Sequence, residues 1–398
     1  MNVREITNGV YYVGVNDRTS QLFEGLWPLP YGVTYNSYVV KGADHTALID
    51  TVSIDELHSF LKNIRTLNLD QQIDYLVINH MEPDHSGSIP EIVRMFPNIK
   101  IVGNKKTEEM IRGFYKVDGE DRYHIVKDGD TLDLGGKTLR FYTIPMVHWP
   151  ETMTTYVVED KLMFTGDAFG TFGALNGGVV DTEMDTDLYI EEMYRYYSNI
   201  VGKYGLPVQK ALAKLKDIEM DYICPTHGPV WKDRINEVVG IYSDLSAYKS
   251  EPGAVIVYGS MYGNTAEVAE SIAAELATYG IKKIIVHNAS ISSMSNMISD
   301  AFRYKILIVG SSTYSMRLFP PVEHFMSAME TREIKHKAFG IFSNFTWAKG
   351  IASSKLAEYS ERMKIPVVAE LAIQHSSSSQ TSEDVKAFVK KIVDNANF

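Results

Sequence analysis

The sequence has one cysteine, Cys224, among its 398 residues. A single cysteine excludes an internal disulfide, and it excludes a four-cysteine iron or zinc centre built by this chain alone. Long apolar runs are missing as well, because no uninterrupted segment approaches the roughly 18 residues that a membrane-spanning helix needs. The formal net charge of -11 leaves no excess of positive charge. The sequence therefore argues against a membrane as a partner and against nucleic acid as a partner.

The composition is that of a globular protein, with 45% hydrophobic and 22% charged residues. A chain of this length is too long for one ordinary core, so more than one domain is expected. The turn-forming stretch 249–253 marks the boundary, and we predict one domain over residues 1–250 and a second over residues 251–398. Residues 1–5 carry no signal-peptide pattern, so we expect a cytoplasmic protein.

Potential metal ligands are densest just after the apolar run 75–78, which predicts a buried strand. His80, Glu82, Asp84 and His85 fall within six residues of one another. A helix would distribute these side chains around its circumference, whereas a loop at the end of a strand can direct all of them into one cavity. We therefore expect this loop to form half of a two-metal site.

Three further candidate ligands, His148, Asp167 and His227, each follow a predicted strand close to Gly or Pro. If these strands belong to one α/β sandwich and end at one edge, their side chains converge. The whole set holds four imidazoles, three carboxylates and no thiolate, which suits two ions bridged by a carboxylate. Three carboxylates favour iron, while ligand type alone leaves zinc open.

Other features of the first domain leave two interpretations each. Asp50 ends a predicted strand, and it either supports the metal ligands or forms an ordinary turn. The apolar loop 22–30 is either a lid or a loop packed on the sheet. The helix expected in the later part of 181–197 places either a tyrosine over the metals or a packed aromatic face.

The second domain begins with a strand over 254–258, a hydroxyl-rich loop over 260–265 and a helix over 266–276. This order is typical of a phosphate-binding site at a helix N-terminus. The loop has no Lys, which argues against nucleotide triphosphate hydrolysis. Strands and helices then alternate to residue 364, which predicts a doubly wound parallel sheet whose ligand lies at the strand C-terminal ends.

Three loops at those ends supply hydroxyls for a phosphate and aromatic rings for a flat ring system, so they predict a flavin mononucleotide (FMN) site. The candidate residues are Ser260, Met261, Tyr262, Gly263, Asn264, Thr265, Ser311, Ser312, Thr313, Tyr314, Ser315, Ser343, Asn344, Phe345, Trp347 and Gly350. The serine-rich stretch 375–380 is expected to be a flexible loop without assigned chemistry.

With these motifs the chain resembles the flavodiiron proteins over essentially its whole length. The family's H-x-E-x-D-H motif stands at 80–85, with Glu82 where hydrolytic metallo-β-lactamase relatives usually have His. The flavodoxin-like S/T-x-T-G-x-T loop stands at 260–265, with Tyr262 in place of a small hydroxyl residue. The resemblance implies a metallo-β-lactamase-like αββα sandwich followed by a flavodoxin-like doubly wound parallel sheet.

The resemblance also implies the cofactors, two non-haem iron ions and FMN. It implies that Asp167 bridges the two irons, and in some members water replaces the ligand that corresponds to His85. The remaining ligands are expected to be His80, Glu82 and His148 for one iron and Asp84, His85 and His227 for the other.

The activity implied is reduction of dioxygen to water, of nitric oxide to nitrous oxide, or of both, and the sequence does not decide between the gases. A rubredoxin is the expected electron donor, with reduced deazaflavin as an alternative, and a head-to-tail homodimer or a homotetramer is expected. Because the sequence ends at Phe398 without a rubredoxin-like or flavin reductase domain, we expect the minimal two-domain class. The competing interpretations are a zinc-dependent hydrolase fused to a flavodoxin electron carrier, and an electron-transfer protein with a structural metal.

Overall fold

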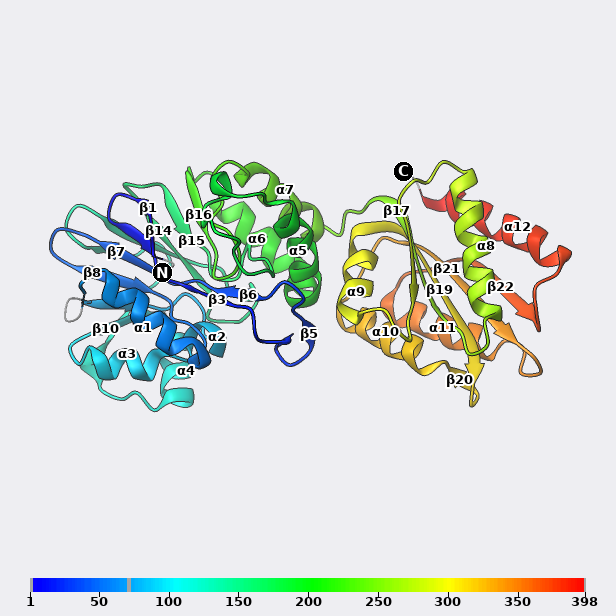
Figure 1. The fold of residues 1–398 in the computed structure, drawn as a ribbon, viewed down its shortest axis with the longest axis horizontal. Helices are drawn as coiled ribbons and strands as arrows, with labels where there is room; N and C mark the ends of the chain where they lie inside the picture. Colours follow the sequence, from blue (N-terminus) through cyan, green and yellow to red (C-terminus); the bar gives the residue numbers. More distant parts are fainter. Residues whose placement is uncertain (1–2, 70–72, 397–398) are drawn as a thin grey trace. The chain divides into compact units, whose positions relative to one another are not determined.

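The computed structural model describes residues 3–69 and 73–396, and the chain divides into two compact units (Figure 1). Unit 1 comprises Met1–Tyr197 and Leu206–Ser243, and unit 2 comprises Ser198–Gly205 and Asp244–Phe398. The predicted domain division at residue 250 stays a prediction. No helix within the described ranges is long and apolar enough to cross a membrane.

Unit 1 is an αββα sandwich with two main sheets. The first sheet has seven strands in the order β1-β2-β7-β8-β9-β10-β11, and the second has five in the order β12-β13-β14-β15-β16. The strands of the first sheet are Arg4–Thr7 (β1), Val10–Tyr12 (β2), Tyr38–Lys41 (β7), Thr46–Ile49 (β8), Tyr75–Val77 (β9), Lys100–Gly103 (β10) and Tyr123–Ile125 (β11). Those of the second are Thr131–Asp133 (β12), Thr138–Thr143 (β13), Met153–Val157 (β14), Leu162–Phe164 (β15) and Tyr222–Cys224 (β16).

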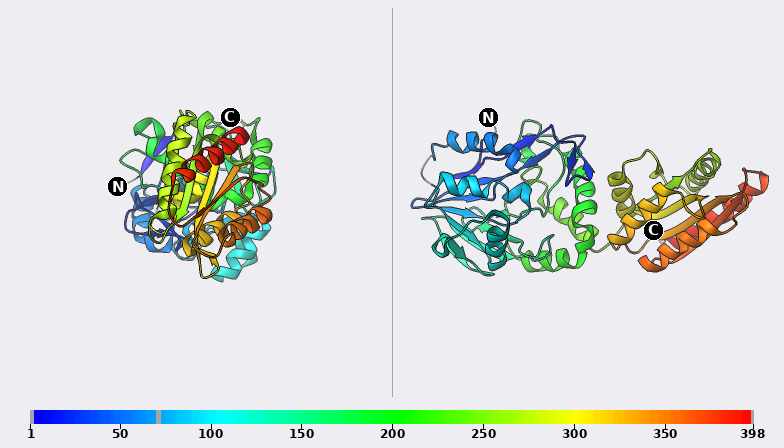
Figure 2. Two further views of the ribbon diagram at one scale, coloured as in Figure 1. Left: turned by 90° about the vertical axis from the view of Figure 1, so that its right-hand side faces the viewer. Right: turned by 90° about the horizontal axis from the view of Figure 1, so that it is seen from below.

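Helices cover the sheets of this sandwich. Figures 1 and 2 show α1, α3 and α4 gathered on one side of it and α5, α6 and α7 on another. The helices are Leu57–Thr66 (α1), Pro83–Ser86 (α2), Ile89–Met95 (α3), Lys105–Tyr115 (α4), Asp187–Tyr196 (α5), Gly205–Leu215 (α6) and Ile235–Ser246 (α7).

Strand direction explains why the candidate ligands of the second sheet meet. β13 and β15 both run antiparallel to β14, and β16 runs parallel to β15. The C-terminal ends of β13, β15 and β16 therefore lie at one edge of the sheet. The loops that leave this edge carry His148, Asp167 and His227, and the loop after β9 in the other sheet carries His80.

Unit 2 is a flavodoxin-like parallel sheet in the order β18-β17-β19-β21-β22, with β20 paired antiparallel to β19. The strands are Glu251–Gly259 (β17), Ile284–Asn288 (β18), Tyr304–Tyr314 (β19), Arg317–Leu318 (β20), Ala338–Phe345 (β21) and Val367–Gln374 (β22). The helices are Asn264–Thr278 (α8), Met294–Arg303 (α9), Pro320–Thr331 (α10), Ile351–Met363 (α11) and Ser379–Ala396 (α12). These strand orders confirm the predicted α/β fold class, an αββα sandwich followed by a doubly wound parallel sheet.

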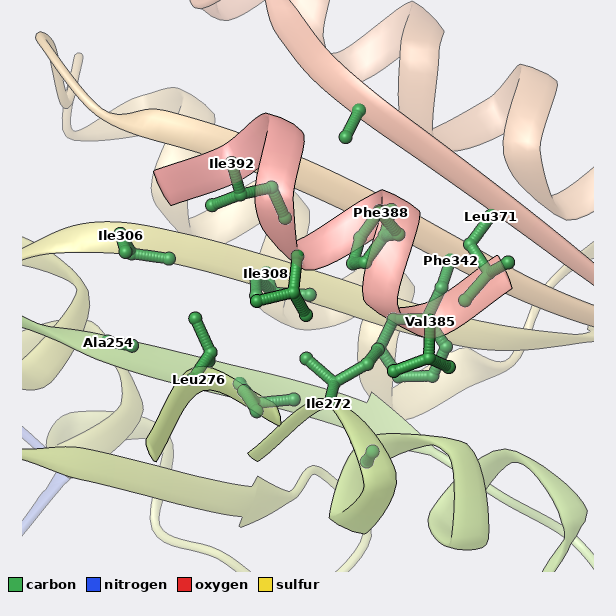
Figure 3. Close-up of a cluster of buried hydrophobic side chains, with 14 of the residues drawn as sticks. Ala254, Ile272, Leu276, Ile306, Ile308, Phe342, Leu371, Val385, Phe388 and Ile392 are labelled. Carbon is green, nitrogen blue, oxygen red and sulfur yellow. The ribbon is translucent and has the colours of Figure 1, made fainter. Parts of the chain in front are cut away.

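The core of unit 2 lies where α8 and α12 pack on one face of this sheet (Figure 3). Ile272 of α8 and Phe388 of α12 meet strand residues such as Ile308 there, and all three are at most 3% exposed. Close packing extends into the strands, because a Cβ atom on Gly310 of β19 would lie 2.0 Å from the ring of Phe342 on β21. A residue without a side chain is therefore required at this position.

Several sequence expectations differ from the structure in detail. The single strand expected over 10–15 is two strands, because the chain leaves β2 and enters β3 (Val15–Asp17), which pairs with β6 (Val33–Tyr35). The loop 22–30 contains a small hairpin of β4 (Leu22–Phe23) and β5 (Trp27–Pro28). The flexible loop expected over 375–380 is wrong at its end, since α12 already begins at Ser379.

Candidate metal centre and flavin pocket

The seven predicted metal ligands converge on one buried region of unit 1. Two groups of ligand atoms form there, each with all members within 4.8 Å of one another. The first group is His80, Glu82, His148 and Asp167, and the second is Asp84, His85 and His227. All except Asp84 are buried, so the structure brings together side chains from four loops that are far apart in the sequence.

Asp167 joins the two groups through its two carboxylate oxygens. Oδ2 lies 3.0 Å from His148 Nε2 and 3.6 Å from His80 Nε2. Oδ1 lies 2.8 Å from His85 Nε2 and 3.8 Å from His227 Nε2. Asp167 therefore faces both groups at once, which is the geometry expected of a bridging carboxylate.

The other two carboxylates each face one group only. Glu82 Oε2 lies 3.1 Å from His148 Nε2 and 3.5 Å from His80 Nε2. Asp84 lies 3.4 Å from His85 Nε2 through Oδ1 and 3.3 Å from His227 Nε2 through Oδ2. Each group thus has its own carboxylate and its own pair of imidazoles.

Several of these atoms lack hydrogen-bond partners although they are buried. Within the described residues, Nε2 of His80, of His85 and of His227 makes no hydrogen bond, and neither carboxylate oxygen of Asp84 accepts one. Buried polar atoms without partners are rare and destabilising in proteins. Their convergence on two points fits two cations, whose binding would satisfy all of them.

Neighbouring groups fix the orientation of the imidazoles. His80 Nδ1 lies 2.9 Å from Glu151 Oε1, and the Met81 N–H donates to the same oxygen at 2.9 Å. Burial opposes ionisation of Glu151, but the hydrogen bond and the charge of His80 outweigh it and lower the pKa of that carboxyl. On the other side, His227 Nδ1 lies 2.6 Å from the Thr34 carbonyl oxygen.

Asp50 supports the strand end that leads to His80. Its carboxylate accepts hydrogen bonds from the backbone N–H of Asn79 at 2.7 Å and from the Asn79 side-chain amide at 2.9 Å. Asp50 also has a φ of 53°. Asp50 therefore supports the metal ligands, because it holds the residue that precedes a candidate ligand, and the structure shows no turn at residues 50–53.

The hairpin β4–β5 lies against the metal centre through its inward-facing aromatic side chain. The Phe23 ring lies 5.3 Å from the His227 ring, and the Tyr196 ring lies 5.5 Å from the same imidazole. Glu24, on the same hairpin, accepts a hydrogen bond from Trp27 Nε1 at 3.0 Å. Loss of water around its carboxyl group, together with the nearby carboxylate of Glu82, raises the pKa of Glu24 to about 7. The loop 22–30 therefore contacts the centre, and Tyr196 is one tyrosine beside it.

A cavity of about 350 Å³ lies at the C-terminal ends of β17, β19 and β21 in unit 2. Its size is within the range of small-molecule sites. The predicted residues that line it are Ser260, Met261, Tyr262, Asn264, Thr265, Ser312, Thr313, Ser315, Asn344, Phe345 and Trp347. It is also lined by three residues that were not predicted, Met316, Thr346 and Ala348.

Five predicted flavin residues do not line this cavity. Ser311 and Ser343 are buried behind it, where the Ser311 hydroxyl accepts from the Phe319 N–H and the Ser343 hydroxyl pairs with Ser353. Tyr314 packs on Phe319 instead. The other two are the glycines at the N-caps of α8 and α11, Gly263 and Gly350.

The comparisons with known proteins cover both units. The model of the ODP family beta lactamase matches residues 33–228, and that of a flavodoxin domain matches residues 255–372. An uncharacterized protein of Methanocaldococcus jannaschii is 32% identical over 98% of each chain. The anaerobic nitric oxide reductase flavorubredoxin of Escherichia coli is 30% identical over 92% of this chain and 77% of its own length.

Solved structures agree along the whole chain. The rubredoxin oxygen:oxidoreductase of Desulfovibrio gigas superposes with a TM-score of 0.94 at 26% identity, covering 99% of this chain and 98% of that one. The flavodiiron protein of Giardia intestinalis gives 0.93 at 25% identity, covering 100% and 98%. The chain belongs to the flavodiiron protein family. It is an oxidoreductase whose cofactors are a non-haem diiron centre and FMN.

Both cofactors fit the residues that this flavodiiron protein presents. The N-terminus of α8 faces the flavin cavity beside Ser260 and Thr265, which suits the phosphate of FMN. Trp347, at the other side of the cavity, is 87% exposed and is free to cover a flat ring. For the metals, the fit rests on the unpartnered imidazole and carboxylate atoms described above.

Sequence reasoning missed several contributors to the metal centre. Glu151 lies three residues after His148, and that proximity was the one signal that could have drawn attention to it. The contribution of Thr34 is a backbone carbonyl, so no side-chain pattern could have indicated it. Glu24 lies in the loop 22–30, and the sequence alone does not show that this loop reaches the metal centre.

Proposed function

We propose that this protein reduces dioxygen to water, nitric oxide to nitrous oxide, or both, with electrons that reach a diiron centre from FMN. The observation that carries the proposal is Asp167, whose two oxygens face two separate ligand groups in a buried site. Two adjacent metal positions suit reactions in which two oxygen or two nitrogen atoms must be handled together.

The ligand assignment is part of the proposal. We infer that Asp167 bridges the two irons and that His85 is a ligand rather than being replaced by water, because His85 Nε2 is buried without a hydrogen-bond partner among the described residues and lies in one group with the ligand atoms of Asp84 and His227. The first iron would be held by His80, Glu82 and His148, and the second by Asp84, His85 and His227.

When bound, two ferrous ions and reduced FMN supply the four electrons that convert one dioxygen and four protons to two waters, or the two electrons that convert two nitric oxide molecules and two protons to nitrous oxide and water. The chain itself orients the ligands. Glu151 fixes the ring of His80, and the Thr34 carbonyl fixes the ring of His227. Phe23 and Tyr196 cover the His227 side of the centre and exclude bulk water there.

Tyr196 has a second feature that bears on the reaction. Its hydroxyl is buried and has no hydrogen-bond partner among the described residues. A phenolic O–H in that state is available to donate to a small molecule bound beside it. The aromatic residue thus combines the two roles considered from the sequence, a packed ring and a group next to the metals.

The competing function is a zinc-dependent hydrolase fused to a flavodoxin. Three carboxylates in the ligand set favour a harder ion than zinc, and Glu82 stands where hydrolytic relatives usually have His. The flavin cavity adds a redox partner for which a hydrolase has no use. These observations support the reductase over the hydrolase.

The proposal also covers the electron donor, the oligomeric state and the cellular location. We infer a rubredoxin-type donor, because the relatives in Escherichia coli and Desulfovibrio gigas carry rubredoxin in their names. A head-to-tail homodimer remains a prediction, tested by light scattering and by mixing protomers that lack either the iron ligands or FMN. The cytoplasmic location also remains a prediction.

The test is a steady-state assay of the iron- and FMN-loaded protein with reduced rubredoxin and each gas in turn. We expect turnover with at least one gas, and loss of that turnover in a variant with Asp167→Ala. A matched variant in unit 1, Gly240→Ala, meets nothing within 4 Å of its new Cβ atom, so it should keep full turnover. Failure of the loaded protein to consume either gas would contradict the proposal.

A further inference from the structure

The two metal positions differ in what lies behind their histidines. His80 contacts the carboxylate of Glu151 through Nδ1, at 2.9 Å. His227 Nδ1 lies 2.6 Å from the neutral carbonyl oxygen of Thr34 and has no other hydrogen-bond partner in the described part of the chain. The Nδ1 atom of His85 has no hydrogen-bond partner among the described residues. Of these three imidazoles, one alone has an anion behind it.

Glu151 meets His80 in a fully buried position. Its side chain and that of His80 are both 0% exposed. Its Oε1 atom lies against two N–H groups, since the Met81 backbone donates to it from 2.9 Å while it faces His80 Nδ1. The other oxygen, Oε2, has no hydrogen-bond partner among the described residues. An ionised carboxylate fits this position, because Oε1 accepts from the Met81 N–H and faces an imidazole nitrogen, and such charge-assisted contacts stabilise the negative charge.

A carboxylate behind a metal-bound histidine strengthens that histidine as a ligand. It fixes the tautomer, so that Nδ1 carries the hydrogen and Nε2 faces the metal, and it raises the electron density on the ring. In this structure His80 Nε2 points into the first ligand group, 3.6 Å from Asp167 Oδ2. A more basic ligand stabilises a ferric ion more than a ferrous one, because the charge of the ferric ion is higher.

We propose that Glu151 makes the metal position at His80 the more electron-rich of the two, so that the iron held there is the easier of the two to oxidise. Glu151 acts through His80 and is therefore a positioning residue rather than a catalytic one. The inference rests on the diiron assignment in the proposed function. It goes beyond that assignment by giving the two irons different potentials and by naming the residue responsible.

The test compares Glu151→Gln with Glu151→Asp in the iron-loaded protein. Gln keeps an oxygen for the two N–H groups but removes the charge, whereas Asp keeps the charge. Loss of such a supporting partner typically weakens metal affinity about 10-fold to 100-fold. If the whole loss of affinity falls on the ferric ion, the reduction potential of one iron rises by about 59 to 118 mV, at about 59 mV for each tenfold change in affinity.

The measurement is a potentiometric titration followed by electron paramagnetic resonance and Mössbauer spectroscopy. We expect Glu151→Gln to raise the potential of one iron and leave the other in place, and Glu151→Asp to stay closer to the wild type. Unchanged potentials in Glu151→Gln, or an equal rise at both irons, would overturn the proposal.

Titration of metal-free protein with cobalt(II) gives a readout that does not depend on iron loading. We expect two binding steps in the wild type and, in Glu151→Gln, one step weakened about 10-fold to 100-fold with the other unchanged. Equal weakening of both steps, or of neither, would overturn the role of Glu151. If the wild type holds no iron as purified, the proposed function fails, whereas the cobalt result still decides the role of Glu151.

Discussion

Removal of both metals should make the stability of unit 1 depend on pH in a way that the loaded protein does not show. Burial alone would lower the pKa of His85, but the carboxylates of Asp84 and Asp167 outweigh it and raise that pKa to about 9 from an ordinary 6.5. For His148, burial is likewise outweighed by Asp167 and Glu82, and its pKa also rises to about 9. In the metal-free protein, protons on these imidazoles take the place of the cations.

The stability of the metal-free protein should fall as the pH rises, because both pKa values are higher in the folded protein than in the unfolded chain. Because the folded protein binds these protons more tightly than the unfolded chain, the stabilisation is complete below pH 6.5 and is lost as the pH rises through about 9. At about 1.4 kcal/mol per pH unit, the gap between 6.5 and about 9 corresponds to about 3 kcal/mol for each histidine. Both histidines share Asp167, so the two contributions overlap, and we expect about 3 kcal/mol in total.

Urea unfolding followed by tryptophan fluorescence measures this effect. Three of the four tryptophans, Trp27, Trp149 and Trp231, belong to unit 1, and the Trp149 ring lies 5.3 Å from that of His80. Chelated protein should lose about 3 kcal/mol between pH 6.5 and pH 9.5, while loaded protein should lose much less, because bound metal excludes the protons.

Two variants sharpen this prediction. The double variant His85→Asn, His148→Asn removes both proton sites and should flatten the pH dependence of the chelated protein. His124→Asn replaces an exposed histidine on β11 and should leave that dependence unchanged. Equal stability of the chelated wild type at both pH values would refute the reasoning, since it would mean that the carboxylates do not hold protons on these histidines.

Three further predictions concern single positions. Glu82→His should lower iron content, favour zinc and abolish gas reduction, as judged by metal analysis and the two gas assays; a variant with full iron and activity would contradict this. Thr265→Val should weaken FMN binding roughly 30-fold in a fluorescence titration, because loss of a hydrogen bond to a charged phosphate costs about 2 kcal/mol; an unchanged affinity would place the phosphate elsewhere. Gly310→Ala should destabilise unit 2 by about 1 to 3 kcal/mol in thermal unfolding, since its Cβ would overlap the ring on β21; a stability equal to that of Gly240→Ala would contradict this.

Much of the metal centre could be predicted from sequence because its ligands follow a simple rule. His80, His148, Asp167 and His227 all come just after strands that end near one another. An apolar run that stops at a polar residue is visible without the fold. Glu151 follows no such rule, because it lies in a turn and acts through space on a side chain 71 residues earlier.

Some elements of the fold could not be predicted from the sequence, for different reasons. The strands Leu22–Phe23 and Trp27–Pro28 are two residues long, too short to produce an alternating pattern. Strand β22 alternates between buried and exposed residues. Helix α12 is different, because it begins inside a run of serines that shows no helical pattern. Helix α12 is stabilised by its contacts with the sheet, through Phe388 and Ile392 (Figure 3), rather than by its first residues.

Metal analysis of protein purified without added metal tests the central claim most directly. The seven converging side chains, three of them carboxylates, predict two iron ions per chain. The same protein should lose both ions together when Asp167 is replaced by Ala, because that residue faces both positions. Two zinc ions and no iron per chain would contradict the account.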